Sequence, residues 1–239
     1  MTKYELPMTT ARVEDSARPP SRRSLFRRTA KRALIALPVV LVISWLVVHH
    51  RPSWYRPPVL NEEGLGRAQR DAIAAADDFG DRLVIRRAFS VTLVDGRVNE
   101  WLAALPEAWP ESKELLPPEL GEPAVHFAAG RLQVGVKLDR RELQSIVSFD
   151  LLPTVSADGR TLNFRLDAIR SGAMPIPVSL MERWLKPIIT ENVADNAPAP
   201  ADALFALPNR FVWPNGERAF RIKNLTLSDG QLQIDIEAL

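Results

Sequence analysis

The sequence predicts an α+β protein in which a single N-terminal transmembrane helix is followed by an antiparallel β-sheet packed on a long amphipathic helix. Three patterns predict this class: an uncharged apolar run near the N-terminus, alternating apolar and polar residues in the second half, and helical apolar spacing near residue 180. The expected divisions are a basic cytoplasmic arm over 1–32, a transmembrane signal anchor over 33–50, a proline-rich stalk over 51–59 and an extracytoplasmic α+β domain over 60–239.

Charge is distributed unevenly along the 239 residues, whose formal net charge is +2. Residues 1–32 carry nine Lys or Arg against three acidic residues, whereas the chain after residue 59 has a net charge of −6. A mildly acidic body argues against a nucleic-acid partner. The chain has no cysteine, which excludes disulfides, thiolate nucleophiles and cysteine-ligated zinc.

The anchor is predicted from the run "ALIALPVVLVISWLVV" over Ala33–Val48, which carries no charge. As a helix the run would extend about 24 Å, a little less than the ~30 Å hydrocarbon core of a bilayer. Arg32 and Arg51 flank it, and their long side chains can reach the interfaces. Because the basic arm precedes the run, the positive-inside rule predicts a cytoplasmic N-terminus and a periplasmic C-terminal domain at the plasma (inner) membrane.

Two other interpretations of the N-terminal region stay open, a cleaved signal peptide and a twin-arginine export signal. A cleaved signal peptide would need a small-residue cleavage site after Val48, and the following residues, "HHRPSWYRPP", offer none. The stretch "SRRSLF" over Ser21–Phe26 matches the arginine pair of a twin-arginine export signal, although membrane orientation alone accounts for these arginines. We expect an uncleaved, single-pass anchor.

The extracytoplasmic domain is expected to begin with a helix over Asn61–Gly80, because Asn61 is a good N-cap and Gly80 a good C-terminal stop. A strand over Leu83–Leu93 follows, and Asp95 then caps a short helix. One face of the short helix is apolar and carries Val98, Trp101, Leu102 and Leu105.

Segments with a period of two predict an antiparallel sheet over the rest of the domain. Apolar and polar residues alternate in 130–138, 142–152, 160–169 and 231–239, and a hairpin turn is expected at Asp158–Gly159. Within 220–227 the apolar residues change from even to odd positions, which predicts a β-bulge near Asn224. One face of these strands is polar, so the other must be covered.

The expected cover is an amphipathic helix over 177–190, whose apolar stripe includes Met181, Trp184, Leu185 and Ile188. Pro187 predicts a kink that lets the helix follow a curved sheet. Just before this helix, the "MPIP" stretch places Met174 and Ile176 at a sheet edge, where they either pack in the core or form the rim of a groove.

Motifs for nucleophilic catalysis, phosphate binding and zinc-dependent hydrolysis are missing from the sequence. His126 is flanked by apolar residues and is expected to be structural, and Asp150 and Asp167 lie on the polar side of their strands and are expected to be solvated. We therefore predict no enzymatic activity, no catalytic residue, no cofactor and no metal site.

The order of elements resembles a known group of envelope proteins. An anchor, a strand with a short helix ("VTLVDGRVNEWLAAL"), a β-meander, the "SGAMPIP" ledge, an amphipathic helix and a closing hairpin resemble the YpmS-like family over about residues 83–239. The resemblance extends more loosely to the LmeA and AsmA-type proteins of the TULIP-like (tubular lipid-binding) group. Val98–Asn99 stands where the family usually has a Leu-Asn pair, and Gly96 replaces a better helix former. The resemblance implies a strongly curved sheet wrapped around a helix, with an elongated apolar groove for acyl chains.

The expected function is a membrane-anchored extracytoplasmic lipid-binding or lipid-transfer module of the cell envelope. Its expected partners are the acyl chains of membrane lipid, and the plasma membrane through residues 33–50. A packed core in place of an open groove remains the alternative at each lining position. The residues expected to line the groove are Trp101, Leu102, Met174, Ile176, Met181, Trp184, Leu185 and Ile188.

A second function class also stays open, namely a non-enzymatic scaffold or assembly factor in a cell-envelope complex. Its contact surface for envelope protein partners would be the Pro- and Glu-rich excursion over 106–123, near Trp101 and Trp109. The basic arm, expected to be disordered, would then recruit partners or contact anionic lipid headgroups.

Overall fold

The computed structural model describes residues 37–108, 120–140, 143–177, 179, 205–213 and 218–239. The chain divides into two compact units, Met1–Ile43 and Ser44–Leu239. In the first unit, residues 37–43 are helical and their apolar side chains are exposed, with Leu37 and Leu41 each 60% accessible to solvent. The helix continues to residue 48 in the second unit.

Within the described residues, no helix combines the length and the apolar character needed to cross a membrane. The expected anchor begins at Ala33, and its residues 33–36 lie outside the described part of the chain. Of the amphipathic helix expected over 177–190, only Pro177 and Ser179 are described. Residues 109–119 of the expected Pro- and Glu-rich excursion also lie outside it.

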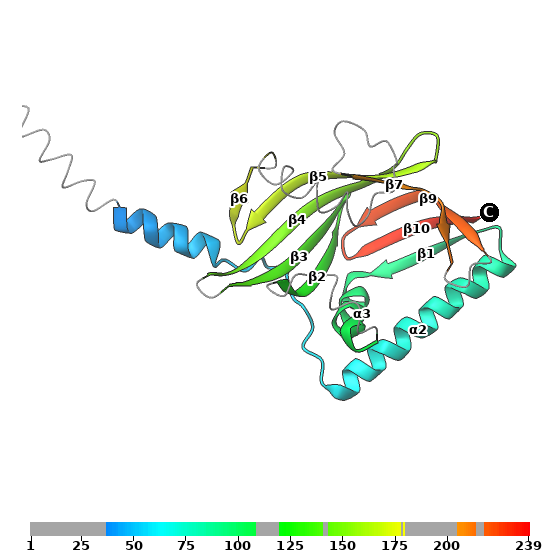
Figure 1. Ribbon diagram of the computed structural model, residues 1–239, viewed down its shortest axis with the longest axis horizontal. Coiled ribbons are helices and arrows are strands. Elements are labelled where there is room, and N and C mark those ends of the chain that lie inside the picture. The colour runs from blue at the N-terminus through cyan, green and yellow to red at the C-terminus, as the bar shows by residue number, and fades with distance from the viewer. Residues whose placement is uncertain (1–36, 109–119, 141–142, 178, 180–204, 214–217) are drawn as a thin grey trace, which may run out of the picture. The chain divides into compact units, whose positions relative to one another are not determined.

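The second unit confirms the expected α+β class with antiparallel strands, although these form two sheets where a single sheet was expected (Figure 1). After the helix over 37–48, its labelled elements in chain order are α2 (Glu62–Ile85), β1 (Ala88–Val94), α3 (Asp95–Ala108), β2 (Leu120–Ala128), β3 (Arg131–Arg140), β4 (Leu143–Val155), β5 (Thr161–Ser171), β6 (Met174–Ile176), β7 (Phe205–Pro208), β8 (Phe211–Val212), β9 (Ala219–Ser228) and β10 (Gln231–Ala238).

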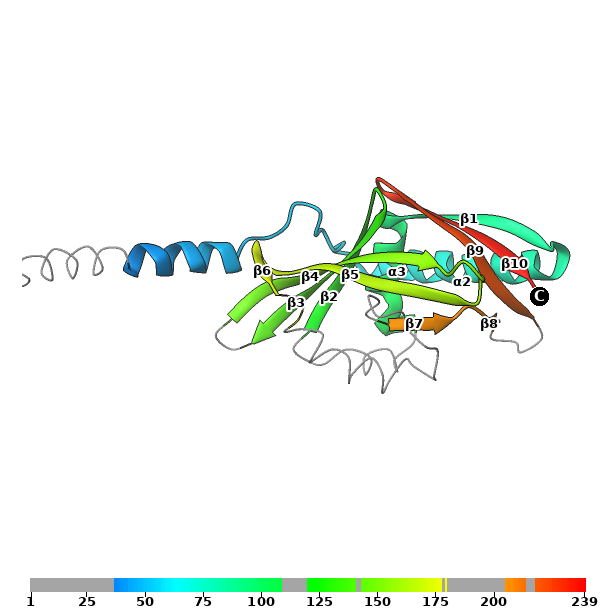
Figure 2. The ribbon, with the colours of Figure 1, turned by 90° about the horizontal axis from the view of Figure 1, so that it is seen from above.

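The described strands form two sheets, in both of which neighbouring strands run antiparallel. One sheet has the order β1-β10-β9-β8, and the other has the order β2-β3-β4-β5-β6, with β7 also paired to β5. β6 pairs with the end of β5 at Ile169–Ser171, whereas β7 pairs with its start at Thr161–Phe164. Strands β2 to β6 follow one another in chain order, so the second sheet is a meander (Figure 2).

Two local predictions within the sheets are confirmed. The turn at Asp158–Gly159 is present: Gly159 has a φ of 68°, and the Asp158 carboxylate accepts hydrogen bonds from the Arg160 N–H and the Ser156 hydroxyl. The bulge near Asn224 is also present, because Asp235 pairs with Asn224 while Ile236 pairs with Ile222. Lys223 is therefore the extra residue, and it changes the phase of the apolar side chains.

One buried polar side chain and two backbone hydrogen bonds link the two sheets. Asn209, between β7 and β8, is only 3% exposed. Its side-chain amide donates hydrogen bonds to the Gly159 and Ile222 carbonyl oxygens and accepts one from the Ile222 N–H. A pair of backbone bonds also crosses between hairpin turns, from Gly130 N–H to Leu227 O and from Gly230 N–H to Phe127 O. The sheets are thus joined by hydrogen bonds as well as by apolar packing.

The helix expected over Asn61–Gly80 is longer than predicted. Its N-terminus agrees with the prediction, because the Asn61 side chain accepts a hydrogen bond from Gly64 N–H. Its C-terminus lies at Ile85, after which Arg86 is extended. Gly80 does not stop the helix but allows a close approach, since a Cβ atom there would lie 3.0 Å from Nε1 of Trp213.

The proline-rich stalk packs on the six-stranded sheet. Tyr55 is 1% exposed and donates a 2.6 Å hydrogen bond from its hydroxyl to the Glu122 carbonyl oxygen. A Cβ atom at Gly135 of β3 would lie 2.7 Å from Cδ2 of Tyr55 and 2.8 Å from Cη2 of Trp54. The absence of a side chain at Gly135 makes room for both rings against the sheet.

The last turn of the helix over 37–48 is held by the corner where β5 turns into β6. The Ala173 N–H donates to the Val47 carbonyl oxygen at 2.8 Å, and the Ser145 hydroxyl donates to the Val48 carbonyl oxygen at 2.8 Å. Gly172, with a φ of 60°, lies directly against these two carbonyl groups. The corner therefore satisfies carbonyl oxygens that a helix C-terminus otherwise leaves without partners.

Candidate functional site

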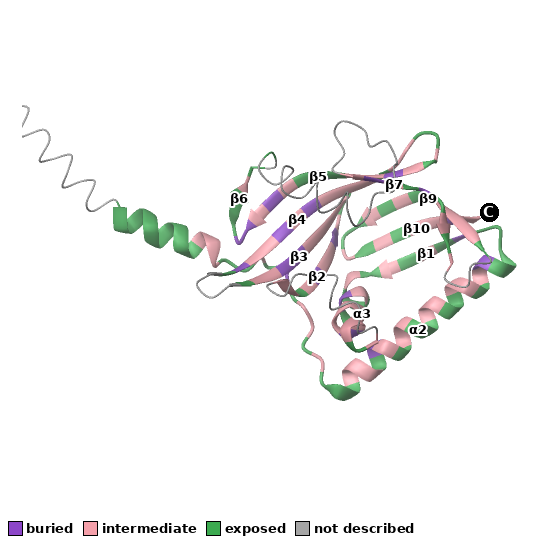
Figure 3. Ribbon diagram, in the orientation of Figure 1, coloured by how far each residue is buried: buried purple, intermediate pink, exposed green. Residues whose placement is uncertain are grey.

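A groove with a volume of about 800 Å³ lies between α2 and the four-stranded sheet. Figure 1 shows α2 and β1 diverging from the turn after Ile85, with α3 at the far end. Only Ala68 and Leu83 of α2 are buried, so most of the helix is not packed down on the sheet (Figure 3). We refer to this hollow as the α2 groove.

The walls of the α2 groove follow from two sequence patterns. On the α2 side the lining residues Ala72, Ala75 and Ala76 recur at helical spacing, and their methyl groups are too small to fill the space. On the sheet side the lining includes Val91 of β1 and Ile234 of β10, which are direct cross-strand partners. A small-residue helix face opposite a β-branched sheet face thus creates apolar walls with space between them.

An aromatic cluster closes the end of the α2 groove near the α2–β1 turn. The Phe79 ring lies 4.9 Å from the Trp213 ring, 5.2 Å from Phe220 and 5.4 Å from Phe89, measured between centroids. Buried Leu83, Phe89 and Ile236 form the core beneath it. Because Trp213 packs over Gly80, the cluster is anchored to α2 as well as to the sheet.

A polar cluster marks the opposite end. The Asp71 carboxylate accepts hydrogen bonds from Arg97 Nε and Nη2, both at 2.6 Å, and from Trp101 Nε1 at 2.9 Å. The Arg97 guanidinium also lies over the Trp101 ring, 5.0 Å from its centroid. The hydrogen bonds from Arg97 and then Trp101 lower the pKa of Asp71 below its usual value, so the carboxylate is charged at neutral pH.

A second, smaller hollow of about 260 Å³ lies between α2 and α3, and we refer to it as the α2–α3 cavity. Its lining is almost wholly apolar and includes Val98, Leu102 and Leu105. Trp101 and Ala72 line both the α2 groove and the α2–α3 cavity, so the two hollows meet at these side chains.

The structure brings only some of the predicted lining residues together. Trp101 lines the α2 groove and Leu102 the α2–α3 cavity. Met174 and Ile176 belong to β6 at the edge of the other sheet, where Ile176 packs against Leu166 and Ile169 while Met174 is 40% exposed. They line neither hollow. The remaining four predicted residues, Met181, Trp184, Leu185 and Ile188, lie outside the described residues.

Sequence reasoning missed the alanine face of α2 as a groove wall. The signal was present, because Ala72, Ala76 and Phe79 fall on the apolar stripe of this segment. Alanine is common in helices of any kind, so an alanine stripe does not show whether the helix packs directly on the sheet or lies apart from it. Ile73, which the same stripe includes, is 50% exposed.

The expectation that Asp150 is solvated is wrong. Its side chain is buried, and its carboxylate accepts hydrogen bonds from Arg170 Nη1 at 2.8 Å and Gln133 Nε2 at 3.0 Å. Arg131 Nη1 lies 3.6 Å away. The pairing register shifts between Asp150 and Leu151, and the long arginines from neighbouring strands cover the carboxylate. Asp167, by contrast, is 45% exposed.

His126 has structural partners. Its Nδ1 atom lies 2.7 Å from the Asp95 carboxylate at the start of α3, and its ring stacks on Trp54 at 6.1 Å between centroids. Among the described residues, no group of three or more His, Asp or Glu side chains is placed to hold a metal ion.

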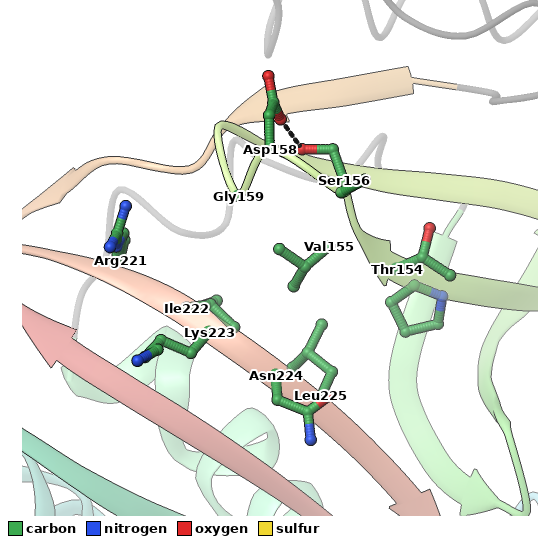
Figure 4. A pocket seen from close by; sticks show the side chains of 12 residues that line it. Thr154, Val155, Ser156, Asp158, Gly159, Arg221, Ile222, Lys223, Asn224 and Leu225 are labelled. Atoms are coloured by element: carbon green, nitrogen blue, oxygen red, sulfur yellow. Dashed lines mark hydrogen bonds between the residues drawn. The ribbon is translucent and has the colours of Figure 1, made fainter.

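A polar pocket of about 480 Å³ lies between the β4–β5 turn and β9 (Figure 4). Its charged groups already have partners within the chain. Arg221 Nε donates to Glu237 at 2.6 Å, and Asp158 accepts from the Ser156 hydroxyl at 2.6 Å. A ligand would have to break these bonds, so the α2 groove is the stronger candidate site.

Comparison with known proteins adds no relative, since no family model and no curated protein matches the chain. The likeness to the YpmS-like, LmeA and AsmA-type proteins therefore rests on the order of elements and on the residues quoted for it.

Proposed function

We propose that this chain is a membrane-anchored lipid-binding or lipid-transfer module that holds an acyl chain in the α2 groove. The observation that carries the proposal is the groove itself. Its volume of about 800 Å³ falls within the ~300–1,000 Å³ typical of ligand pockets, and its lining includes alanines of α2 and aliphatic side chains of the sheet.

The chemistry of the lining favours an apolar chain over a polar metabolite. The charged side chains that line the groove are Asp78, Arg82 and Arg97. Arg82 pairs with Asp78 at 2.8 Å, and Arg97 is taken up by Asp71. Since these charged groups are paired within the chain, affinity would come mainly from burying methylene groups against the alanines, Val91 and Ile234, each contributing about 0.8 kcal/mol.

The anchor belongs to the same proposal. The described part of the helix over 37–48 exposes apolar side chains that include Val39, Leu41 and Leu46, and such exposure is unfavourable in water and favourable in lipid. The basic residues of 1–32 precede it, which by the positive-inside rule gives a cytoplasmic N-terminus and an extracytoplasmic domain at the plasma membrane. Anchoring would raise the local concentration of lipid around the groove.

The test is to purify the full chain in detergent, add palmitic acid, and measure retained fatty acid by native mass spectrometry. Ala75→Trp should fill the α2 groove and abolish retention, because the indole would occupy the space between α2 and Val91. Ile73→Trp is the matched control, since Ile73 is exposed on the same helix and does not line the groove.

Retention by the wild type and Ile73→Trp, with loss in Ala75→Trp, supports the proposal. If the wild type retains no fatty acid, or if all three proteins retain equal amounts, the α2 groove is not a lipid site. Circular dichroism of each variant verifies that the fold is intact.

A further inference from the structure

Trp101 occupies the boundary between the two apolar hollows. It lines the α2 groove on one side and the α2–α3 cavity on the other. Ala72 is the other residue that both linings share, and its methyl group is too small to separate them. The indole is thus the large group at the boundary.

Two interactions fix the position of the indole. Its Nε1–H donates a 2.9 Å hydrogen bond to Asp71 on α2, although Trp101 itself belongs to α3. Arg97, one helical turn earlier on α3, lies over the ring and binds the same carboxylate through two 2.6 Å hydrogen bonds. Trp101 is therefore bonded across the interface between the helices.

We infer that Trp101 is a specificity residue that limits how long an acyl chain the α2 groove accepts. This inference rests on the proposed lipid-binding function. The aromatic cluster around Phe79 closes one end of the groove, and Trp101 separates the other end from a further 260 Å³ of apolar space. Removing the indole joins the two spaces, so the end of a longer chain can enter the α2–α3 cavity.

The direction of the effect follows from the lining of the cavity. Val98, Leu102 and Leu105 offer apolar contacts to additional methylene groups. In the wild type those methylene groups would have to remain in water or bend back against the indole. Longer chains should therefore gain more than shorter chains from loss of the indole.

The experiment offers the full chain in detergent an equimolar mixture of lauric, palmitic and stearic acids, and native mass spectrometry reads the bound fraction of each. Trp101→Ala is expected to raise the bound ratio of stearic to lauric acid by about tenfold relative to the wild type. Leu105→Ala is the control, because it enlarges the α2–α3 cavity without opening the boundary, and its ratio should equal the wild-type ratio.

Trp101→Leu serves as a second variant if the alanine substitution unfolds the protein. Leucine retains apolar packing but has no N–H group to donate to Asp71. A shift toward stearic acid in either Trp101 variant, with none in Leu105→Ala, supports the inference. Fatty acid retained with an unchanged ratio in the folded Trp101 variant overturns the inference and leaves the lipid-binding function standing. Retention of no fatty acid by the wild type overturns both.

Discussion

The side-chain amide of Asn99 hydrogen-bonds to both backbone polar groups of Val125. Its Nδ2 donates to the Val125 carbonyl oxygen at 2.9 Å, and its Oδ1 accepts from the Val125 N–H at 2.7 Å. Asn99 belongs to α3 and Val125 to β2, so the amide attaches the helix that ends the α2 groove to the six-stranded sheet. Asn99 thus has a defined structural role in this chain.

Asn99→Leu should lower the free energy of unfolding by about 2–4 kcal/mol, because two partly buried backbone groups of Val125 would lose their hydrogen-bond partner. Urea denaturation of the full chain in detergent, followed by circular dichroism, measures the change. Asn224→Leu is the control: Asn224 is exposed and its hydrogen bonds are long, at 3.3 and 3.5 Å, so we expect a change within about 0.5 kcal/mol. Equal losses in both variants would contradict the role assigned to Asn99.

Gly172→Ala should loosen the attachment of the helix end to the sheet. The residue has a φ of 60°, and a Cβ atom there would also lie 2.7 Å from the carbonyl carbon of Val48. Hydrogen exchange should become faster at the Ala173 N–H, which donates to Val47 in the wild type.

Gly159→Ala separates the steric effect of Gly172→Ala from the backbone effect. Gly159 has a similar φ of 68°, but a Cβ atom there meets nothing within 4 Å. Both variants incur the cost of placing a non-glycine residue in a left-handed backbone conformation, about 1–2 kcal/mol. Only Gly172→Ala should make hydrogen exchange faster at the Ala173 N–H. Exchange at Ala173 that is unaffected by Gly172→Ala would show that the β5–β6 corner does not hold the helix.

Stability should fall at alkaline pH through Tyr55. Its pKa is raised from 10.0 to about 12, chiefly by burial and also by the nearby charge of Glu122, whereas Arg51 opposes the shift. Since the folded state holds this proton more tightly than the unfolded state, the stabilisation is complete below pH 10 and is lost as the pH rises toward about 12.

Ultraviolet titration of the tyrosinate tests this directly. The chain has two tyrosines, so the Tyr4→Phe variant leaves Tyr55 as the only one to titrate. We expect a midpoint near pH 12, and we expect the alkaline loss of stability to become smaller in Tyr55→Phe. A midpoint near pH 10 would mean that the stalk does not bury Tyr55 against the sheet.

The Asp150–Arg170 pair should respond asymmetrically to substitution. Arg170→Met leaves a buried carboxylate with Gln133 and the more distant Arg131, and we expect a loss of about 3 kcal/mol. Asp150→Asn leaves Arg170, which is 38% exposed and remains hydrated, so a loss of about 1–2 kcal/mol is expected. Urea denaturation measures the free energy of unfolding of both variants. A larger loss of stability for Asp150→Asn than for Arg170→Met would contradict this expectation.

Local features were predictable from the sequence wherever a short pattern determines the backbone. The Asn61 cap, the turn at Asp158–Gly159 and the bulge next to Asn224 depend on neighbours within a few residues, and all three are confirmed. The antiparallel strands were predictable for the same reason, since alternation reports which side chains share a face.

Long-range placement was not predictable in the same way. The sequence assigned Asp150 to the polar face of its strand, but arginines from two other strands meet over it and bury it. Its pattern also predicted that Gly80 ends the helix, whereas Trp213, from a distant part of the chain, approaches this glycine so closely that a Cβ atom there would lie 3.0 Å from its Nε1. Neither neighbour is identifiable from local spacing.

The sequence by itself determined the elements, because caps, turns and apolar periodicity act over a few residues. Only the tertiary structure decided where the space lies. The alanine face of α2 and Val91 of β1 are held apart by α3, Asp71 and the Phe79 cluster. Their separation depends on contacts between distant parts of the chain, so no local sequence pattern predicts it. The candidate groove therefore lies along α2, beside a tryptophan that the sequence did single out.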